Sequence, residues 1–465
     1  MSINEEATAP LRTHRSRAPV RHVTDGRRTQ IGSRLVLKEL VQRGYPFVVM
    51  TNVLGGFALS GRNPFSTHGW NRMYRPTGLM DHNVRAISWP NTDTLYLIAT
   101  LDLRAEPQVV RYPAFDSVYV SLETSALNHY IDIPLSSSRG DFQKPTTVLY
   151  YSANTSGYAG EPVTGVDRVH RLSGDLGVAF ARIMPHSAEP ERMARIMGQI
   201  QHATIQPLSA YLRGQVAPQR RPAVSYPPFG DEKNLFANHF LEVVQFAFNH
   251  TEFDQSDQMD RAAVAAFEKV GVVPGRVYDP RRAPEIDPAM LAELHDEVRA
   301  WARSNRQKHL CDMFLPRGRL TLEAWLASVA TAPLGQPASE AVYPLVETAD
   351  GCPPNARHDY VIRMSRDNMP PVNAFWSLTL YDGVSGFFIP NDRKKYTVGL
   401  NGGMKLNSEG GITIHIAAQK PESAPLENWL PIDRRDLDLS VALRLYHPDL
   451  ERFKSWTPPK LLRRG

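Results

Sequence analysis

Three strand-like segments near the C-terminus alternate apolar residues with hydroxyl, imidazole, guanidinium and phenol groups. The segments are FWSLTLYD (375–382), GITIHIAA (411–418) and VALRLYHP (441–448). Because side chains along a strand point alternately to its two faces, each segment has one apolar face and one face able to do chemistry. The candidates on these segments are Tyr381, His415, Arg444 and Tyr446, with Trp376 on the opposite face.

The polar faces of these segments suit a small molecule that carries oxygen atoms. Arginine holds an anion or a carbonyl oxygen through paired donors, tyrosine donates a hydrogen bond or a proton, and histidine transfers a proton near neutral pH. If the segments are neighbouring strands, these side chains converge. The alternative is an outer sandwich face or an interface between domains. Trp376 is either a core anchor or a stacking surface for a sugar or an aromatic ligand.

A second set of candidates lies in and after WPNTDTLYLIATLDL (89–103). A carboxylate beside a tyrosine or a histidine is the minimum for acid/base catalysis. Here the catalytic candidates are Tyr96, Glu123 and His129, and the substrate-binding candidates are Asn91 and Asp93. The last two also suit a purely local role, because both side chains bond backbone N–H groups well in a turn before a strand.

The sequence contains none of three common catalytic or phosphate-binding motifs. It has no G-x-S-x-G, no G-x-x-x-x-G-K-[ST] and no G-x-G-x-x-G segment. His239 and His250 are eleven residues apart on one expected helix, which separates them by about 16 Å, too far to share an ion. We therefore predict neither a cofactor nor a metal.

The pattern of apolar residues changes twice along the chain. Short β-rich runs fill 85–185, helical periodicity dominates the middle, and β-rich runs return after about 340. We predict an α+β fold with two mainly antiparallel, jelly-roll-like β-sandwich domains joined by a helical region. The divisions are a disordered basic tail (1–30), an N-terminal sandwich (31–190), a helical region (191–335) and a C-terminal sandwich (336–465).

Three local predictions follow from the same patterns. A short helix and an apolar segment are expected within 35–60, and a single helix across 191–213. Residues 95–103 alternate as a strand with one buried face.

Composition and charge point to a soluble, unexported protein. The chain has 465 residues, a formal charge of +5 and two cysteines, and no run approaches the roughly 18 apolar residues that span a bilayer. Two cysteines without metal or disulfide spacing suit the cytoplasm. Arginine-rich ends can touch nucleic acid or anionic membrane, but without a recognition motif we predict neither partner.

Two groups of residues resemble known bacterial families. WPNTDTLYLIATLDLRAEPQVVRYP (89–113) is similar to the Asn-x-Asp-Thr-Leu-Tyr signature of the domain of unknown function twelve-fifty-four. A second group resembles the partner family numbered twelve-fourteen: PPVNAFWSLTLYD (370–382), GGITIHI (410–416), NWLP (428–431), LRLYHPD (443–449) and WTPP (456–459). The resemblance implies a β-sandwich at each end, joined by helices, in a homo-oligomer.

These observations lead to two functional hypotheses, beside the third alternative of a purely structural assembly. The first is a cofactor-independent enzyme that acts on a small organic molecule by elimination, hydrolysis or rearrangement, in a cleft between the sandwiches. The family resemblance suggests the biosynthesis of a specialised metabolite as its setting. The second is a non-catalytic protein that binds a sugar or a lipid in a sandwich groove.

Overall fold

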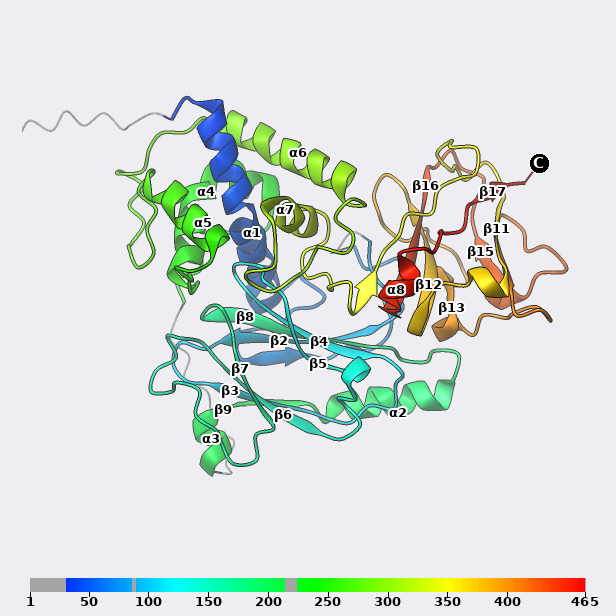
Figure 1. Ribbon diagram of the computed structural model, residues 1–465, viewed down its shortest axis with the longest axis horizontal. Coiled ribbons are helices and arrows are strands. Elements are labelled where there is room, and N and C mark those ends of the chain that lie inside the picture. Colours follow the sequence, from blue (N-terminus) through cyan, green and yellow to red (C-terminus); the bar gives the residue numbers. More distant parts are fainter. Residues whose placement is uncertain (1–30, 86–88, 214–223, 465) are drawn as a thin grey trace, which may run out of the picture.

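The computed structural model describes residues 31–85, 89–213 and 224–464, and it has a mixed α+β fold (Figure 1). Its described strands form four mostly antiparallel sheets, two in the N-terminal half and two in the C-terminal half. The predicted α+β class is therefore confirmed. The predicted basic tail (1–30) lies outside the described residues.

Two sheets form the N-terminal sandwich. The first sheet has the order β1-β2-β8-β4-β5, and the second has the order β7-β6-β3-β9. The strands are β1 (Arg72–Tyr74), β2 (Leu95–Asp102), β3 (Gln108–Tyr112), β4 (Val120–Ala126), β5 (Asp132–Ser136), β6 (Thr146–Tyr151), β7 (Arg168–Arg171), β8 (Leu176–Ile183) and β9 (Thr204–Pro207). Side chains of both sheets share one apolar core.

Strand β2 is buried on both faces, whereas the sequence predicted one buried face. Leu97 and Leu101 point into the core between the sheets. Ile98 points the other way and joins a second core made chiefly by helices. Helices thus cover the outer face of the first sheet, as Figure 1 shows, and the N-terminal half is built in three layers.

Five helices form this covering layer. They are α1 (Arg34–Leu59), α4 (Glu232–Asn249), α5 (Gln258–Glu268), α6 (Pro288–Asn305) and α7 (Leu322–Val329). Helix α1 runs through Pro46 and packs against α4, α5, α6 and α7. The structure therefore places 34–59 with the helices rather than in the N-terminal sandwich, and as one long helix rather than a short one. A helix that is apolar nearly all round is stable only when other elements surround it.

The segment 191–213 is two short helices and a strand rather than the single helix predicted. Helix α2 (Pro190–Gln201) ends before β9, and α3 (Leu208–Arg213) follows it. Strand β9 pairs antiparallel with β3 and completes the second sheet. Tertiary pairing here overrides the helical periodicity of the sequence.

The C-terminal sandwich also has two sheets, with the orders β10-β16-β12-β13 and β15-β14-β11-β17. The strands are β10 (Ala341–Val342), β11 (Tyr360–Met364), β12 (Val372–Asp382), β13 (Thr397–Gly399), β14 (Ile412–Ala417), β15 (Trp429–Pro431), β16 (Leu439–Pro448) and β17 (Leu462–Arg463), and a short helix, α8 (Leu450–Phe453), follows β16. The apolar faces predicted for β12, β14 and β16 all point into the core between these two sheets.

Candidate functional site

The polar face of β12 and β16 points away from the core of the C-terminal sandwich. The two strands pair antiparallel, with Ser377 opposite Arg444 and Phe375 opposite Tyr446. Thr379 and Tyr381 lie on the same face by alternation. All of these side chains are buried, so the face is covered rather than exposed to solvent.

The turn that leads into β2 covers this face. Asp93 accepts hydrogen bonds from the hydroxyls of Ser377, Tyr446 (3.2 Å) and Thr397 (3.2 Å). Asn91 donates to Tyr446 Oη at 3.0 Å and accepts from the backbone N–H of Asp93 at 2.6 Å. The pair therefore makes the local turn contact considered above and also joins the N-terminal sandwich to the C-terminal one.

Arg444 lies at the centre of the covered face. Its guanidinium donates to Thr379 Oγ1 at 2.9 Å, to Tyr381 Oη and to the carbonyl of Trp89. Tyr381 in turn donates to the carbonyl of Pro90 at 2.6 Å. Burial raises the pKa of Tyr381 to about 12, although the Arg444 charge acts in the opposite direction. Among the described residues no carboxylate forms an ion pair with Arg444, which is held by hydroxyls and carbonyls.

The N-terminal sandwich contributes Tyr96, Arg182 and Glu123. Tyr96 on β2 is the register partner of Arg182 on β8, and the guanidinium lies 5.6 Å from the centre of the phenol ring. Arg182 Nη1 donates to Glu123 Oε2 at 2.6 Å. Burial raises the pKa of Glu123 to about 7 despite this ion pair. Glu123 Oε1 has no hydrogen-bond partner within the described chain.

Two further residues lie close to these side chains but belong to neither sandwich core. Tyr343 follows β10 and packs against a buried cluster that includes Tyr119, Phe375 and Tyr446. Arg306, which caps the C-terminal end of α6, lies with its guanidinium 6.0 Å from the centre of the Tyr343 ring.

The inter-sandwich site is the group Tyr96, Arg182, Arg306, Tyr343 and Arg444. Burial raises the pKa of Tyr96 and of Tyr343, and the charges of Arg182 and Arg444 oppose that rise for both phenols. The same two arginines therefore act on both tyrosines. Residues of both sandwiches and of the helical region thus meet in one place.

Three polar groups of this site make no hydrogen bond within the part of the chain that the structure describes. Tyr96, Tyr343 and Arg306 are each half-buried. Within residues 31–85, 89–213 and 224–464, neither phenol hydroxyl makes a hydrogen bond, and the Arg306 guanidinium makes no hydrogen bond or ion pair. None of these polar atoms is fully buried, so they offer hydrogen-bonding positions to solvent or to a ligand.

Three predicted residues lie elsewhere. His415 is on β14, in the other sheet of the C-terminal sandwich. The polar face of β14 therefore points to the side of the domain opposite Arg444. Trp376 is a core residue, only 4% exposed. His129 accepts from the N–H of Leu334 at 3.2 Å, and burial lowers its pKa to about 3, so it is neutral at physiological pH.

Sequence reasoning missed Arg182, Arg306 and Tyr343. Arg182 had a usable signal, since it is the one charged residue in the strand LGVAFARI (176–183), and a charge within such a run is almost always paired. Arg306 is one of several basic residues near the end of a helix, and Tyr343 follows a strand of only two residues. Nothing in either local pattern marks a site.

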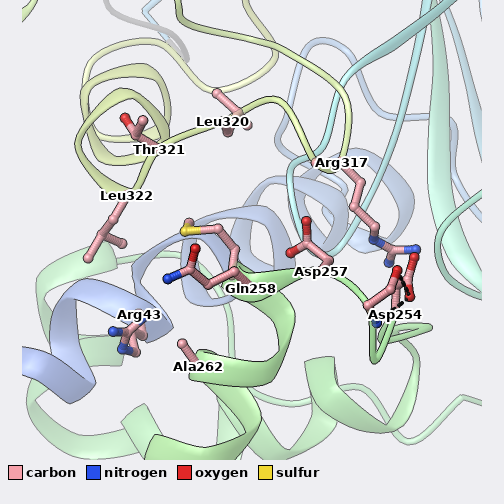
Figure 2. Close-up of a pocket in the computed structure, with 12 residues that line it drawn as sticks. Arg43, Asp254, Asp257, Gln258, Ala262, Arg317, Leu320, Thr321 and Leu322 are labelled. Carbon is pink, nitrogen blue, oxygen red and sulfur yellow. Dashed lines mark hydrogen bonds between the residues drawn. The ribbon is translucent and has the colours of Figure 1, made fainter.

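The helical layer holds a separate cavity of about 690 Å³ between α1, α5 and the segment before α7 (Figure 2). Its charged residues already have partners. Arg43 pairs with Glu39 at 3.0 Å, and Arg317 pairs with Asp260. Asp257 accepts from the backbone at the start of α5. None of the predicted site residues lines this cavity.

The fold and the site together define an α+β protein of two sandwiches, with a polar site where they meet the helices. Residues 70–206 match the model of a family described as a protein of unknown function (DUF1254). Residues 340–450 match a second family with the same description (DUF1214). The chain therefore carries both domains in the predicted order, which confirms the resemblance.

Two solved structures are similar to the chain. A crystal structure of the VPA0106 protein from Vibrio parahaemolyticus is 22% identical, with a TM-score of 0.69, and the match covers 93% of this chain and 100% of that one. An uncharacterised protein from Burkholderia cenocepacia is 16% identical, with a TM-score of 0.43, and the match covers 92% and 94%. The first likeness supports the fold alone. No curated protein matches the chain.

Among the helices of the described residues, none combines the length and apolar character needed to cross a bilayer.

Proposed function

We propose that the chain binds a small organic molecule that carries oxygen atoms at the inter-sandwich site and converts it by acid/base chemistry. The observation that carries this proposal is the pair of hydroxyls of Tyr96 and Tyr343. Both side chains are half-buried, and neither hydroxyl makes a hydrogen bond within the described chain. Two hydroxyl donors beside fixed positive charges suit a carbonyl, carboxylate or alcohol oxygen of a ligand.

The protonation states of the site support acid/base chemistry. Raised pKa values keep both phenols protonated at neutral pH, so they act as hydrogen-bond or proton donors. Glu123 has a pKa of about 7, which allows it to take up or release a proton near neutral pH. Arg182 links this carboxyl to Tyr96, because it touches both. Elimination, hydrolysis and rearrangement all need such a donor and acceptor pair.

The walls of the site favour a planar ligand. The Tyr96 ring lies 4.7 Å from the centre of Phe180 and 6.0 Å from that of Phe65. Trp89 is half-buried and packs 5.1 Å from Tyr381. Phe65, Phe180 and Tyr381 are buried, so Trp89 and Tyr96 are the rings of this group that a flat organic ligand can reach.

Removal of the two hydroxyls tests the binding step. Benzamide and benzoate serve as probes, and isothermal titration calorimetry measures their affinity for wild type and for the double variant Tyr96→Phe, Tyr343→Phe. We expect the double variant to bind each probe at least roughly tenfold more weakly. Tyr211→Phe is the matched control, since this tyrosine lies on α3 beside the second N-terminal sheet. Equal affinities in wild type and double variant would contradict the proposal.

Glu123→Gln tests the chemical step. The amide has a similar shape but does not titrate, so turnover of a metabolite extract from the native host is expected to stop while probe binding persists. If the wild type binds ligands but yields no product after long incubation, the chain is the non-catalytic sugar- or lipid-binding protein of the second hypothesis. The homo-oligomer expected from the family resemblance also remains a proposal.

A further inference from the structure

The charges around the inter-sandwich site do not balance among the residues that the structure describes. Arg182 has a carboxylate partner in Glu123 at 2.6 Å. The Asp93 carboxylate lies on the same covered face as Arg444, and its charge acts on that arginine. Arg306 has no carboxylate within ion-pair distance in the described chain, although its side chain is half-buried. Among the described residues, three guanidinium groups of the site thus face two carboxylates, while Glu340, whose charge also acts on Glu123, is offset by Arg139.

The position of Arg306 rules out a simple surface role for its charge. A cation at the C-terminal end of a helix interacts favourably with the helix dipole, but this effect does not require burial. Burial lowers the pKa of Arg306, and the nearby charge of Arg444 lowers it further. An unpaired, partly desolvated cation close to another cation is unfavourable unless an anion joins it.

We infer that the ligand of the inter-sandwich site is a carboxylic acid in its singly charged form, and that Arg306 pairs with its carboxylate. One negative charge balances the one guanidinium of the site whose charge no carboxylate of the described residues offsets. The planar fork of arginine fits a carboxylate through two parallel N–H bonds. The Tyr343 hydroxyl, on the ring that Arg306 overlies, supplies a further donor. This inference rests on the proposed function, because it assigns the ligand class of the same site.

Arg306 is a specificity-determining residue outside both matched families. The two models cover 70–206 and 340–450, whereas Arg306 belongs to the helical region between them. The sandwiches supply the hydroxyl donors and the titrating carboxyl, and the helical region supplies the charge that selects an acid. Other chains with the same two domains and a different residue at this place would select other ligands.

The test compares benzoate with benzamide, which share a ring and a shape but differ in charge. In wild type at about pH 8 we expect benzoate to bind roughly tenfold more tightly than benzamide. Arg306→Gln should abolish this preference, because only benzoate loses an ion pair, while Arg306→Lys should retain part of it. Arg303→Gln is the matched control, because it removes one exposed charge from the same end of α6. Its preference should equal that of wild type.

The possible failures are distinct. If Arg306→Gln keeps the preference for benzoate, or if wild type binds both probes equally, the carboxylate inference is wrong and the proposed site still stands. If wild type binds neither probe at millimolar concentration, both proposals fail. A melting temperature of Arg306→Gln close to that of wild type confirms that the variant is folded, which is expected because its side chain makes no hydrogen bond within the described chain.

Discussion

The tyrosines near the junction of the two sandwiches are of two kinds. Tyr381 and Tyr446 have hydroxyls that donate and accept within the protein. Tyr96 and Tyr343 have hydroxyls with no partner among the described residues. The first kind therefore stabilises the fold, and the second kind is free to meet a ligand. The two roles are separable by experiment, since phenylalanine removes only the hydroxyl.

Tyr381→Phe is expected to lower the free energy of unfolding by about 1–2 kcal/mol, because Arg444 loses an acceptor and the carbonyl of Pro90 loses its donor. Tyr343→Phe should change it by less than about 0.5 kcal/mol. Urea denaturation of both variants measures the difference. A larger loss for Tyr343→Phe would show that its hydroxyl has a structural partner and is not free for a ligand.

At the scale of elements, close packing around α1 determines which side chains the helix tolerates. Gly44 lies where α1 meets α4 and α5, and a Cβ added there would stand 2.8 Å from ring atoms of Phe240 and Phe267. Gly198 in α2 is exposed, with nothing within 4 Å of an added Cβ. The same substitution therefore has opposite consequences at the two helices.

Gly44→Ala is expected to destabilise the protein by about 1–3 kcal/mol, because the aromatic rings must shift to admit the methyl group. Gly198→Ala is expected to stabilise it by about 0.5–1 kcal/mol, because alanine forms helix more readily than glycine. Thermal unfolding of the two variants beside wild type checks both signs. A stabilised Gly44→Ala would mean that α1 does not pack this closely on α4 and α5.

At the scale of the whole molecule, buried polar groups join the two sandwiches. Asp93 and Asn91 from the N-terminal sandwich bond hydroxyls of the C-terminal one. Glu340, just before β10, accepts from Ser136 of β5 at 3.0 Å. A satisfied polar interface fixes the relative orientation of its two sides, because any slip leaves buried groups unpaired. The position of the inter-sandwich site depends on this orientation.

The pH dependence of stability follows from Glu340. Burial raises its pKa to about 7, while Arg139 and Tyr119 lie beside it and its charge acts on Glu123. In the folded state Glu340 thus holds its proton more tightly than in the unfolded chain. This contribution to stability is complete below about pH 4 and is lost as the pH rises toward 7.

The amide of Glu340→Gln mimics the protonated carboxyl. Between about pH 5 and pH 8 the free energy of unfolding should therefore fall less in the variant than in wild type, and the two decreases should differ by about 1–3 kcal/mol. Urea denaturation at several pH values measures this difference. Glu347→Gln is the control, because Glu347 is 57% exposed and pairs with Lys460 on the surface. Parallel profiles for wild type and Glu340→Gln would contradict the prediction. The pKa of Glu123 is shifted in the same direction, so Glu123 contributes to the fall that remains in Glu340→Gln.

The sequence by itself determined which residues share a face. Alternation placed Tyr381, Arg444 and Tyr446 opposite the apolar residues of their strands, and the structure keeps that division. The family signatures also placed the two domains correctly along the chain. Both depend on local patterns, since the period of a strand is set by the backbone within a few residues.

Only the tertiary structure decided which faces meet. His415 has the same alternating pattern as Arg444, yet β14 lies in the other sheet, so the two residues are on opposite sides of the sandwich. Arg182, Tyr343 and Arg306 join the site from three distant segments. Such contacts arise from long-range strand pairing and helix packing. A local pattern cannot predict these contacts. It shows which face of an element is apolar, but not which other element will pack against that face.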